Sequence, residues 1–403
     1  MFVSYLPWRG CRSGPARGSA TPMMPMMVPL MVLLVVIVLG FAGCASRAPM
    51  AGPFDSVAFL RQEYRQRLGA AKAASLPVPF EINAQVRAAI EGRINPAASE
   101  PVRADQVVDF VFSYLGLRYN LTPTRDAVET FAAHEGNCLS FVNLFVGIAR
   151  EKRLNPFYVE VKDFHRWSFD HGMVVSHGHI VAGMRVDGKL STFDFLPYKP
   201  KSYRDFEPID DRRAAAHYFN NLAAEALLAG DVQRGHDLAE TAVELEPGFD
   251  KAVNNLAVSL LRMGHPHKAA ELLGEALERF PESVHLITNL ARAEQQLGNT
   301  EAANALLQRI EDLDLANPFF YLYRGEMALA QGDTATALAY MRKALRQDTE
   351  LPEVHLGLLK TFLAIGDKER ALHHLERALT LDATNEEARR YAGLLLGPQA
   401  ASE

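Results

Sequence analysis

Cys138 lies where a helix is expected to begin, a position that can turn a thiol into a nucleophile. Gly136 and Asn137 favour a turn, and apolar residues then recur at helical spacing, at positions 141, 142, 144, 145, 148 and 149. The partial positive charge at a helix N-terminus stabilises a thiolate relative to a thiol. We therefore predict that Cys138 is a reactive residue, with an inert buried cysteine as the alternative.

A nucleophilic thiol needs a nearby base, and five histidines lie between residues 134 and 179. The best candidate is His179, because residues 176–196 resemble a β-hairpin with the two-residue turn Asp187-Gly188. In this register Asp194 lies diagonally across from His179 on the same face. The opposite face is then apolar, which selects the register; its residues are Ile180, Ala182, Met184, Val186, Phe193 and Phe195.

The chain order Cys138, His179, Asp194 resembles the transglutaminase-like superfamily, which has a papain-like α+β fold. The resemblance covers roughly residues 101–200. It rests on Gly136-Asn137-Cys138-Leu139-Ser140-Phe141, on the run from Leu144 to Arg150, and on the fifteen residues from His179 to Asp194.

The resemblance implies that Cys138 attacks a carboxamide or peptide carbonyl. His179 would hold the thiol proton and pass it to the leaving amine, and Asp194 would orient His179. The backbone N–H of Cys138 would be one oxyanion donor. Whether water or an amine resolves the thioester stays open, so both a hydrolase and a transferase are compatible with this site.

A metal site is the rival interpretation of the same histidines. His177 and His179 form a His-x-His pair on one strand face, and His165, Asp170 and His171 lie upstream. Imidazole pairs of this kind do bind zinc, but the spacing matches no compact metal signature. We therefore expect no metal and no other cofactor.

The C-terminal half has an internal repeat. Glycine recurs every 34 residues, at positions 230, 264, 298, 332 and 366, and a small residue follows each glycine five positions later. This pattern resembles the tetratricopeptide repeat, in which a glycine ends the first of two amphipathic helices. We predict an all-α solenoid of five repeats over residues 216–385 and a capping helix and tail over residues 386–403. Its concave face would bind a protein or peptide, with a purely structural support as the alternative.

The N-terminus indicates export. Residues 1–43 contain Arg9, Arg12 and Arg17 and no acidic residue, and an apolar run follows them. The sequence Phe41-Ala42-Gly43-Cys44 resembles a bacterial lipobox, which implies a lipoprotein-type signal peptide, lipidation of Cys44 and a tether over residues 44–53. The same resemblance favours a lipid-anchored protein of the bacterial cell envelope, at the outer membrane and facing the periplasm. The alternative is an uncleaved transmembrane anchor, since residues 18–46 carry no charge.

Composition limits the remaining function classes. A net charge of −6 gives no basic excess for binding nucleic acid. The length of 403 residues fits several domains. We assign residues 54–205 to the transglutaminase-like domain, including an N-terminal helical extension. The resulting hypothesis is a membrane-tethered periplasmic cysteine acyl-transfer enzyme that acts on a protein or peptide amide, with repeats that dock substrate or partner. The alternative is a catalytically inactive peptide-binding adaptor with the same fold.

Overall fold

The fold is described from a computed structural model, which covers residues 55–170, 173–196, 203–313 and 318–396. Side chains 163–170 and 173–177 are not part of this description. The predicted signal peptide, the tether with Cys44, and the tail 397–403 lie outside the described residues. Within them, no helix is both long enough and apolar enough to cross a membrane.

The first part of the chain is helical and leads to a buried central helix. Twelve consecutive residues of that helix, from Cys138 to Ala149, are buried, because apolar side chains cover its whole circumference. The elements are α1 (Ser56–Leu68), α2 (Ala70–Ser75), α3 (Ala84–Ile90), α4 (Glu100–Asp109), the π-helix η1 (Phe110–Tyr114), α5 (Ala127–Ala133) and α6 (Cys138–Glu151). A short parallel pair of strands, β1 (Arg118–Tyr119) and β2 (Glu135–Gly136), leads directly into α6.

An antiparallel sheet packs beside α6, with strand order β5-β4-β3-β6. Its strands are β3 (Pro156–Asp170), β4 (Met173–Val186), β5 (Lys189–Phe193) and β6 (Phe206–Ile209). The pairing of Ala182 with Phe193 confirms the predicted two-residue turn and its register. Asp187 and Gly188 have positive φ values of 47° and 75°, as a turn of this type requires.

Two strands of this sheet, β3 and β6, were not predicted from the sequence. Strand β3 pairs along its length with β4. The alternation of Val159 and Val161 with Tyr158 and Glu160 is the strand signal in its sequence. Strand β6 pairs with β3, so the sheet continues past residue 205, where we placed the end of this domain. Strand β5 ends at Phe193, before residue 196, where the predicted hairpin ends. Asp194 therefore comes directly after the last paired residue.

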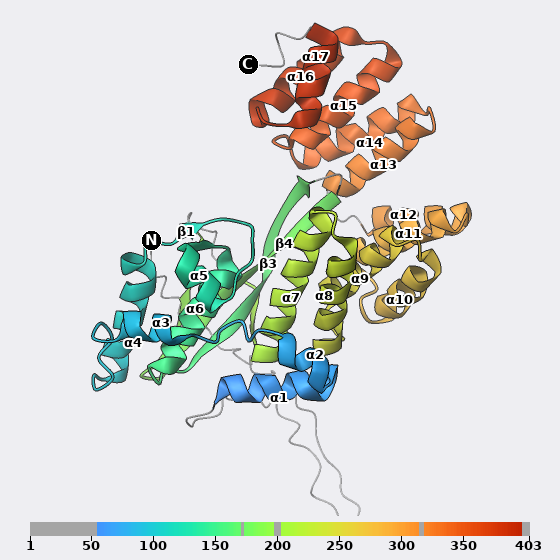
Figure 1. Cartoon of the computed structure of the whole chain (residues 1–403). Coiled ribbons are helices and arrows are strands. Elements are labelled where there is room, and N and C mark those ends of the chain that lie inside the picture. Colours follow the sequence, from blue (N-terminus) through green and yellow to red (C-terminus); the bar gives the residue numbers. More distant parts are fainter. Residues whose placement is uncertain (1–54, 171–172, 197–202, 314–317, 397–403) are drawn as a thin grey trace, which may run out of the picture.

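The C-terminal part is a succession of helix pairs that continues to the end of the described chain (Figure 1). The glycine at the end of each first helix has a φ between 78° and 86°, the left-handed conformation that favours glycine. The helices are α7 (Asp211–Leu228), α8 (Val232–Leu245), α9 (Asp250–Arg262), α10 (Pro266–Arg279), α11 (Val284–Gln296), α12 (Thr300–Asp312), α13 (Pro318–Ala330), α14 (Thr334–Gln347), α15 (Pro352–Ile365), α16 (Lys368–Leu381) and α17 (Glu386–Leu396).

The main apolar cores do not divide where the repeats begin. The first large cluster extends from Leu60 to Ala252 and contains α6, the inner face of the sheet and much of α7 and α8. The second cluster extends from Val253 to Ala392. In Figure 1, α7 and α8 stand beside the long β3–β4 ribbon, with α1 and α2 across their ends. The first repeat is therefore packed into the N-terminal body.

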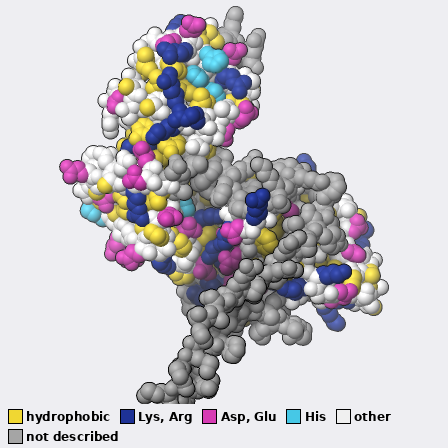
Figure 2. All heavy atoms as spheres, turned by 180° about the vertical axis from the view of Figure 1, so that it is seen from behind, with side chains coloured by type: hydrophobic (Ala, Val, Ile, Leu, Met, Phe, Trp, Pro, Cys, Tyr) yellow, Lys and Arg dark blue, Asp and Glu magenta, His cyan; other side chains and the backbone are white. Residues whose placement is uncertain are grey.

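The charged surface carries both signs. On the face shown in Figure 2, acidic and basic side chains are interspersed among apolar ones over the described residues. The presence of both signs agrees with the small net charge of −6.

Candidate active site

Cys138 is the first residue of α6, as the sequence predicted. The side chain of Asn137 caps this helix, because its Oδ1 accepts a hydrogen bond of 3.0 Å from the N–H of Ser140. Gly136, the residue before Asn137, has little room for a side chain, because a Cβ there would lie 2.6 Å from the Cβ of Ser140. Cys138 is buried, with 8% of the residue exposed.

His179 and Asp194 form the pair that the hairpin register predicts. The Nε2 of His179 donates to Oδ1 of Asp194 over 3.0 Å, and the His179 side chain is 1% exposed. The backbone N–H of Leu196 also donates to Oδ1, over 3.0 Å, and the hydroxyl of Tyr203 donates to Oδ2 over 2.6 Å. Three donors therefore hold this carboxylate in place and keep it charged, and its pKa is lowered although burial alone would raise it.

The structure brings Cys138 and His179 together as well. Burial by itself would raise the pKa of the Cys138 thiol, but the interaction with His179, the charge of that ring and the backbone N–H of Ile180 outweigh burial and lower it. Burial likewise opposes the protonated ring, but the hydrogen bond with Asp194 and the interaction with Cys138 raise the pKa of His179 to about 9. Each group thus favours the charged form of the other, the thiolate of Cys138 and the imidazolium of His179.

The two faces of the hairpin differ as the register argument requires. Ile180, Ala182 and Met184 belong to the large apolar core together with Phe193 and Phe195. Val181 instead joins Val159 and Val161 in a small cluster on the other face, with Tyr203 packed against it. This second face carries the His179–Asp194 pair.

Sequence reasoning missed Tyr203 as a member of the site. Its hydroxyl binds Asp194, and its ring centroid lies 5.5 Å from that of His179. Tyr203 follows Asp194 by nine residues and lies after the end of the predicted hairpin, so no periodic signal connects it to the site.

Of the residues considered for a metal, only His179 has a described side chain. The side chains of His165, Asp170, His171 and His177 fall outside the description. Among the residues whose side chains are described, no group of three His, Cys, Asp or Glu side chains is arranged to hold a metal ion.

The repeat helices lie close to this site. The ammonium of Lys251, on α9, lies 3.1 Å from the point where a Cβ on Gly178 would stand, directly before His179 on β4. Its Nζ is also 3.9 Å from Oε1 of Glu160, which is 5% exposed and pairs with Arg213 on α7 over 3.0 Å. The array therefore contacts the strand that carries the histidine.

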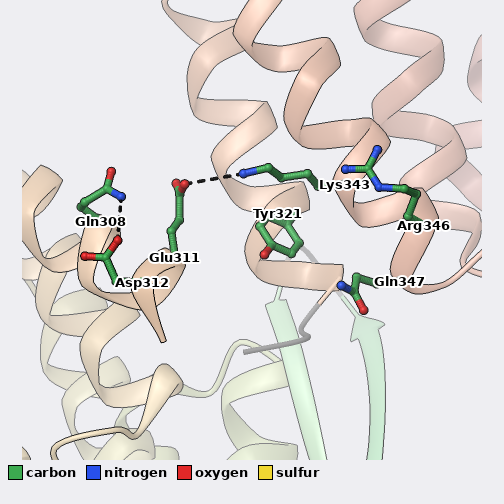
Figure 3. Close-up of a pocket in the computed structure, with 7 residues that line it drawn as sticks. All are labelled: Gln308, Glu311, Asp312, Tyr321, Lys343, Arg346 and Gln347. Carbon is green, nitrogen blue, oxygen red and sulfur yellow. Dashed lines mark hydrogen bonds and ion pairs between the residues drawn. The ribbon is translucent and has the colours of Figure 1, made fainter. Parts of the chain in front are cut away.

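A separate polar pocket lies farther along the array, where α12 meets α13 and α14 (Figure 3). Glu311 and Lys343 form an ion pair of 3.7 Å across it. Its lining is Gln308, Glu311, Asp312, Tyr321, Lys343, Arg346 and Gln347. None of these residues is a cysteine or histidine, so the pocket offers no second site for thiol chemistry.

Comparison with known proteins supports the repeats. Residues 260–318 and 328–394 match the tetratricopeptide-repeat family. Among solved structures, a thermophilic tetratricopeptide-repeat protein of Thermus thermophilus is 24% identical, with a TM-score of 0.40, and the match covers 45% of this chain and 99% of that one. A type IV pilus biogenesis factor, PilW, is 17% identical, with a TM-score of 0.37, over 44% of this chain and 82% of that one.

A third similar structure is MamA from Desulfovibrio magneticus, which is 15% identical with a TM-score of 0.32, over 42% of this chain and 97% of that one. No curated protein matches the chain. The family match lies within the repeats, so a tetratricopeptide-repeat solenoid is established for the C-terminal region. The N-terminal part has helices and a four-stranded sheet, and the family match does not extend to it.

Proposed function

We propose that this chain is a cysteine acyl-transfer enzyme, a transglutaminase-like amide hydrolase or transferase that acts on a protein or peptide. The observation that carries the proposal is the linked set Cys138, His179 and Asp194, in which the Cys138 thiol pKa is lowered and the His179 pKa is raised. A buried thiol with no catalytic role has no need of an imidazole supported by a carboxylate.

The reaction would follow from these positions. The Cys138 thiolate attacks the carbonyl carbon of the amide, and the backbone N–H of Cys138 stabilises the oxygen that gains negative charge. The C–N bond then breaks, and the His179 imidazolium donates its proton to the departing amine. A water or a second amine attacks the thioester while His179 takes a proton from it, and the acyl product leaves with the thiolate restored.

The repeats would dock the substrate or a partner protein. Tetratricopeptide-repeat arrays present extended concave surfaces, and proteins built from them typically bind protein segments. Here Lys251 of the array lies beside Gly178 and within reach of the site. A polypeptide held on α9 could extend from there to Cys138.

The alternative function is a peptide-binding adaptor without catalysis. It is favoured by the comparisons, because the family match lies in the repeats alone. In that case the Cys138 thiol would have an ordinary acidity and the sheet domain would serve only as a binding surface.

Alkylation of Cys138 across pH separates the two functions. A thiolate paired with His179 reacts with iodoacetamide at mildly acidic pH, and His179→Ala should abolish that reaction while His236→Ala, in the array, leaves it unchanged. An alkylation profile typical of an isolated thiol would refute the enzyme.

Substrate trapping is a second test of the proposed enzyme. A Cys138→Ala variant, cross-linked in the cell envelope, should retain the protein substrate.

For location, we propose attachment to the outer membrane, facing the periplasm, through a lipid on Cys44. The support is the sequence Phe41-Ala42-Gly43-Cys44 and the charge pattern before it. Labelled fatty acid should enter the wild-type chain and not a Cys44→Ser variant. Equal labelling of both would refute the anchor.

A further inference from the structure

The first turn of α6 is held by the loop that precedes α5. Asn137 donates from Nδ2 to Oγ1 of Thr124 over 2.7 Å and to the carbonyl of Leu121 over 3.3 Å. The N–H of Arg125 donates to Oγ of Ser140 over 2.8 Å, and that hydroxyl donates to Oδ1 of Asn137 over 2.9 Å. Thr124, Asn137 and Ser140 are all buried, so water does not compete for these bonds.

These contacts fix the orientation of the Asn137 side chain. Its Nδ2 can only donate, and both acceptors of that group lie in the loop, at Thr124 and Leu121. Its Oδ1 therefore faces α6, where it caps the N–H of Ser140 next to Cys138. The cap of the nucleophile helix thus depends on an acceptor at Thr124.

Thr124 is in turn held by Glu225, on the first helix of the repeat array. The N–H of Thr124 donates to Oε1 of Glu225 over 2.7 Å. This bond fixes the backbone of the loop at Thr124. The hydroxyl of the same residue, which accepts from Asn137, is positioned with it.

The same array helix also holds the other end of α6. Arg150, in the last turn of α6, makes two hydrogen bonds of 2.7 Å with the carboxylate of Asp211, the first residue of α7. Both contacts join α6 to α7, one through Thr124 and Asn137 and one directly. The position of the helix that carries Cys138 is therefore linked to the position of α7.

We propose that Glu225 is a positioning residue through which the repeat array controls the capped start of α6 and thereby the acidity of Cys138. Its effect on acidity rests on the proposed function; its effect on the helix start does not. A partner that binds the array and shifts α7 would change the reactivity of the thiol, with no contact to Cys138 itself. The array would then regulate the reactivity of Cys138 as well as dock a substrate or partner protein.

The test compares Glu225→Ala with Glu271→Ala, a substitution of an exposed glutamate on α10 of the same array. Alanine removes the carboxylate that accepts from the Thr124 N–H, so the loop loses this contact with α7. Hydrogen exchange of the Ser140 amide should accelerate about fivefold, as expected for a weakened helix cap. The alkylation profile of Cys138 should shift to higher pH, with about threefold slower reaction at mildly acidic pH.

A second variant, Thr124→Val, removes the hydroxyl that accepts from Asn137 and keeps the test decisive if Glu225→Ala disturbs the array. It should reproduce both effects, and the double variant should add little to either, because the two residues act in one chain of hydrogen bonds. Unchanged Ser140 exchange in Glu225→Ala and Thr124→Val overturns the inference. An ordinary wild-type thiol pKa with accelerated exchange in the variants would instead reject the enzyme and retain the coupling.

Discussion

Replacing Asp194 by Asn tests the electrostatic argument for the site most directly. The carboxylate accepts from Nε2 of His179 over 3.0 Å in a buried setting. A hydrogen bond to a charged group contributes about 1.5–3 kcal/mol, which equals about one to two pKa units. The pKa of His179, raised to about 9 in the wild type, should therefore fall to about 7–8 in Asp194→Asn.

The sign of the effect follows from which form the carboxylate stabilises. Asp194 favours the charged ring, so at about pH 8 the imidazolium fraction should fall from about nine-tenths to between about one-tenth and one-half. The thiolate that this ring stabilises should decrease with it. The assay is the ultraviolet absorbance of the Cys138 thiolate against pH, compared with the rate of alkylation.

The matched control is Asp187→Asn. Asp187 is exposed in the turn of the same hairpin, where its φ of 47° also suits asparagine. This change removes one negative charge from the hairpin without touching His179, so the thiolate profile should stay as in the wild type. If Asp194→Asn also retains that profile, the carboxylate does not support the ring and our reasoning about the triad is wrong.

Three further substitutions probe the surrounding structure. Glu160→Gln leaves Arg213 without its buried partner and should destabilise the fold by about 3–5 kcal/mol in urea unfolding. Although burial alone would raise it, the Glu160 pKa is held below its usual 4.5 by hydrogen bonds and charges from neighbouring basic groups, so this stabilisation is present above about pH 4.5 and is lost as pH falls through the lowered pKa. Gly136→Ala should cost about 1–3 kcal/mol and slow Cys138 alkylation, since the new Cβ would overlap Ser140; equal alkylation would contradict the packing argument. Phe319→Ala, in the second core, should destabilise that core by about 3–5 kcal/mol while alkylation stays normal, and a matching loss of alkylation would show that the two cores unfold together.

Local patterns in the sequence were enough for the repeats and for the hairpin. Glycine every 34 residues places a left-handed residue after each first helix, and the structure has a positive φ at all five positions. The apolar alternation around Asp187-Gly188 selected one register, and the pairing of Ala182 with Phe193 has it. Both signals depend on residues close in the chain, where periodicity and turn chemistry act.

The site required more than these patterns. The sequence placed Cys138 at a helix start and His179 on the same face as Asp194, but the distance between thiol and ring depends on how α6 packs on the sheet. Tyr203 and Glu225 had no recognisable signal, because each reaches its partner from a different element.

By itself the sequence determined the repeat period, the hairpin register and the residue types available for thiol chemistry, since these follow from local geometry and residue spacing. The tertiary structure decided that the first repeat packs into the core of the N-terminal body, and that Glu225 reaches the loop that caps the helix of Cys138. Those contacts join residues about a hundred positions apart, where no periodicity connects them and only the packing of apolar faces brings them together.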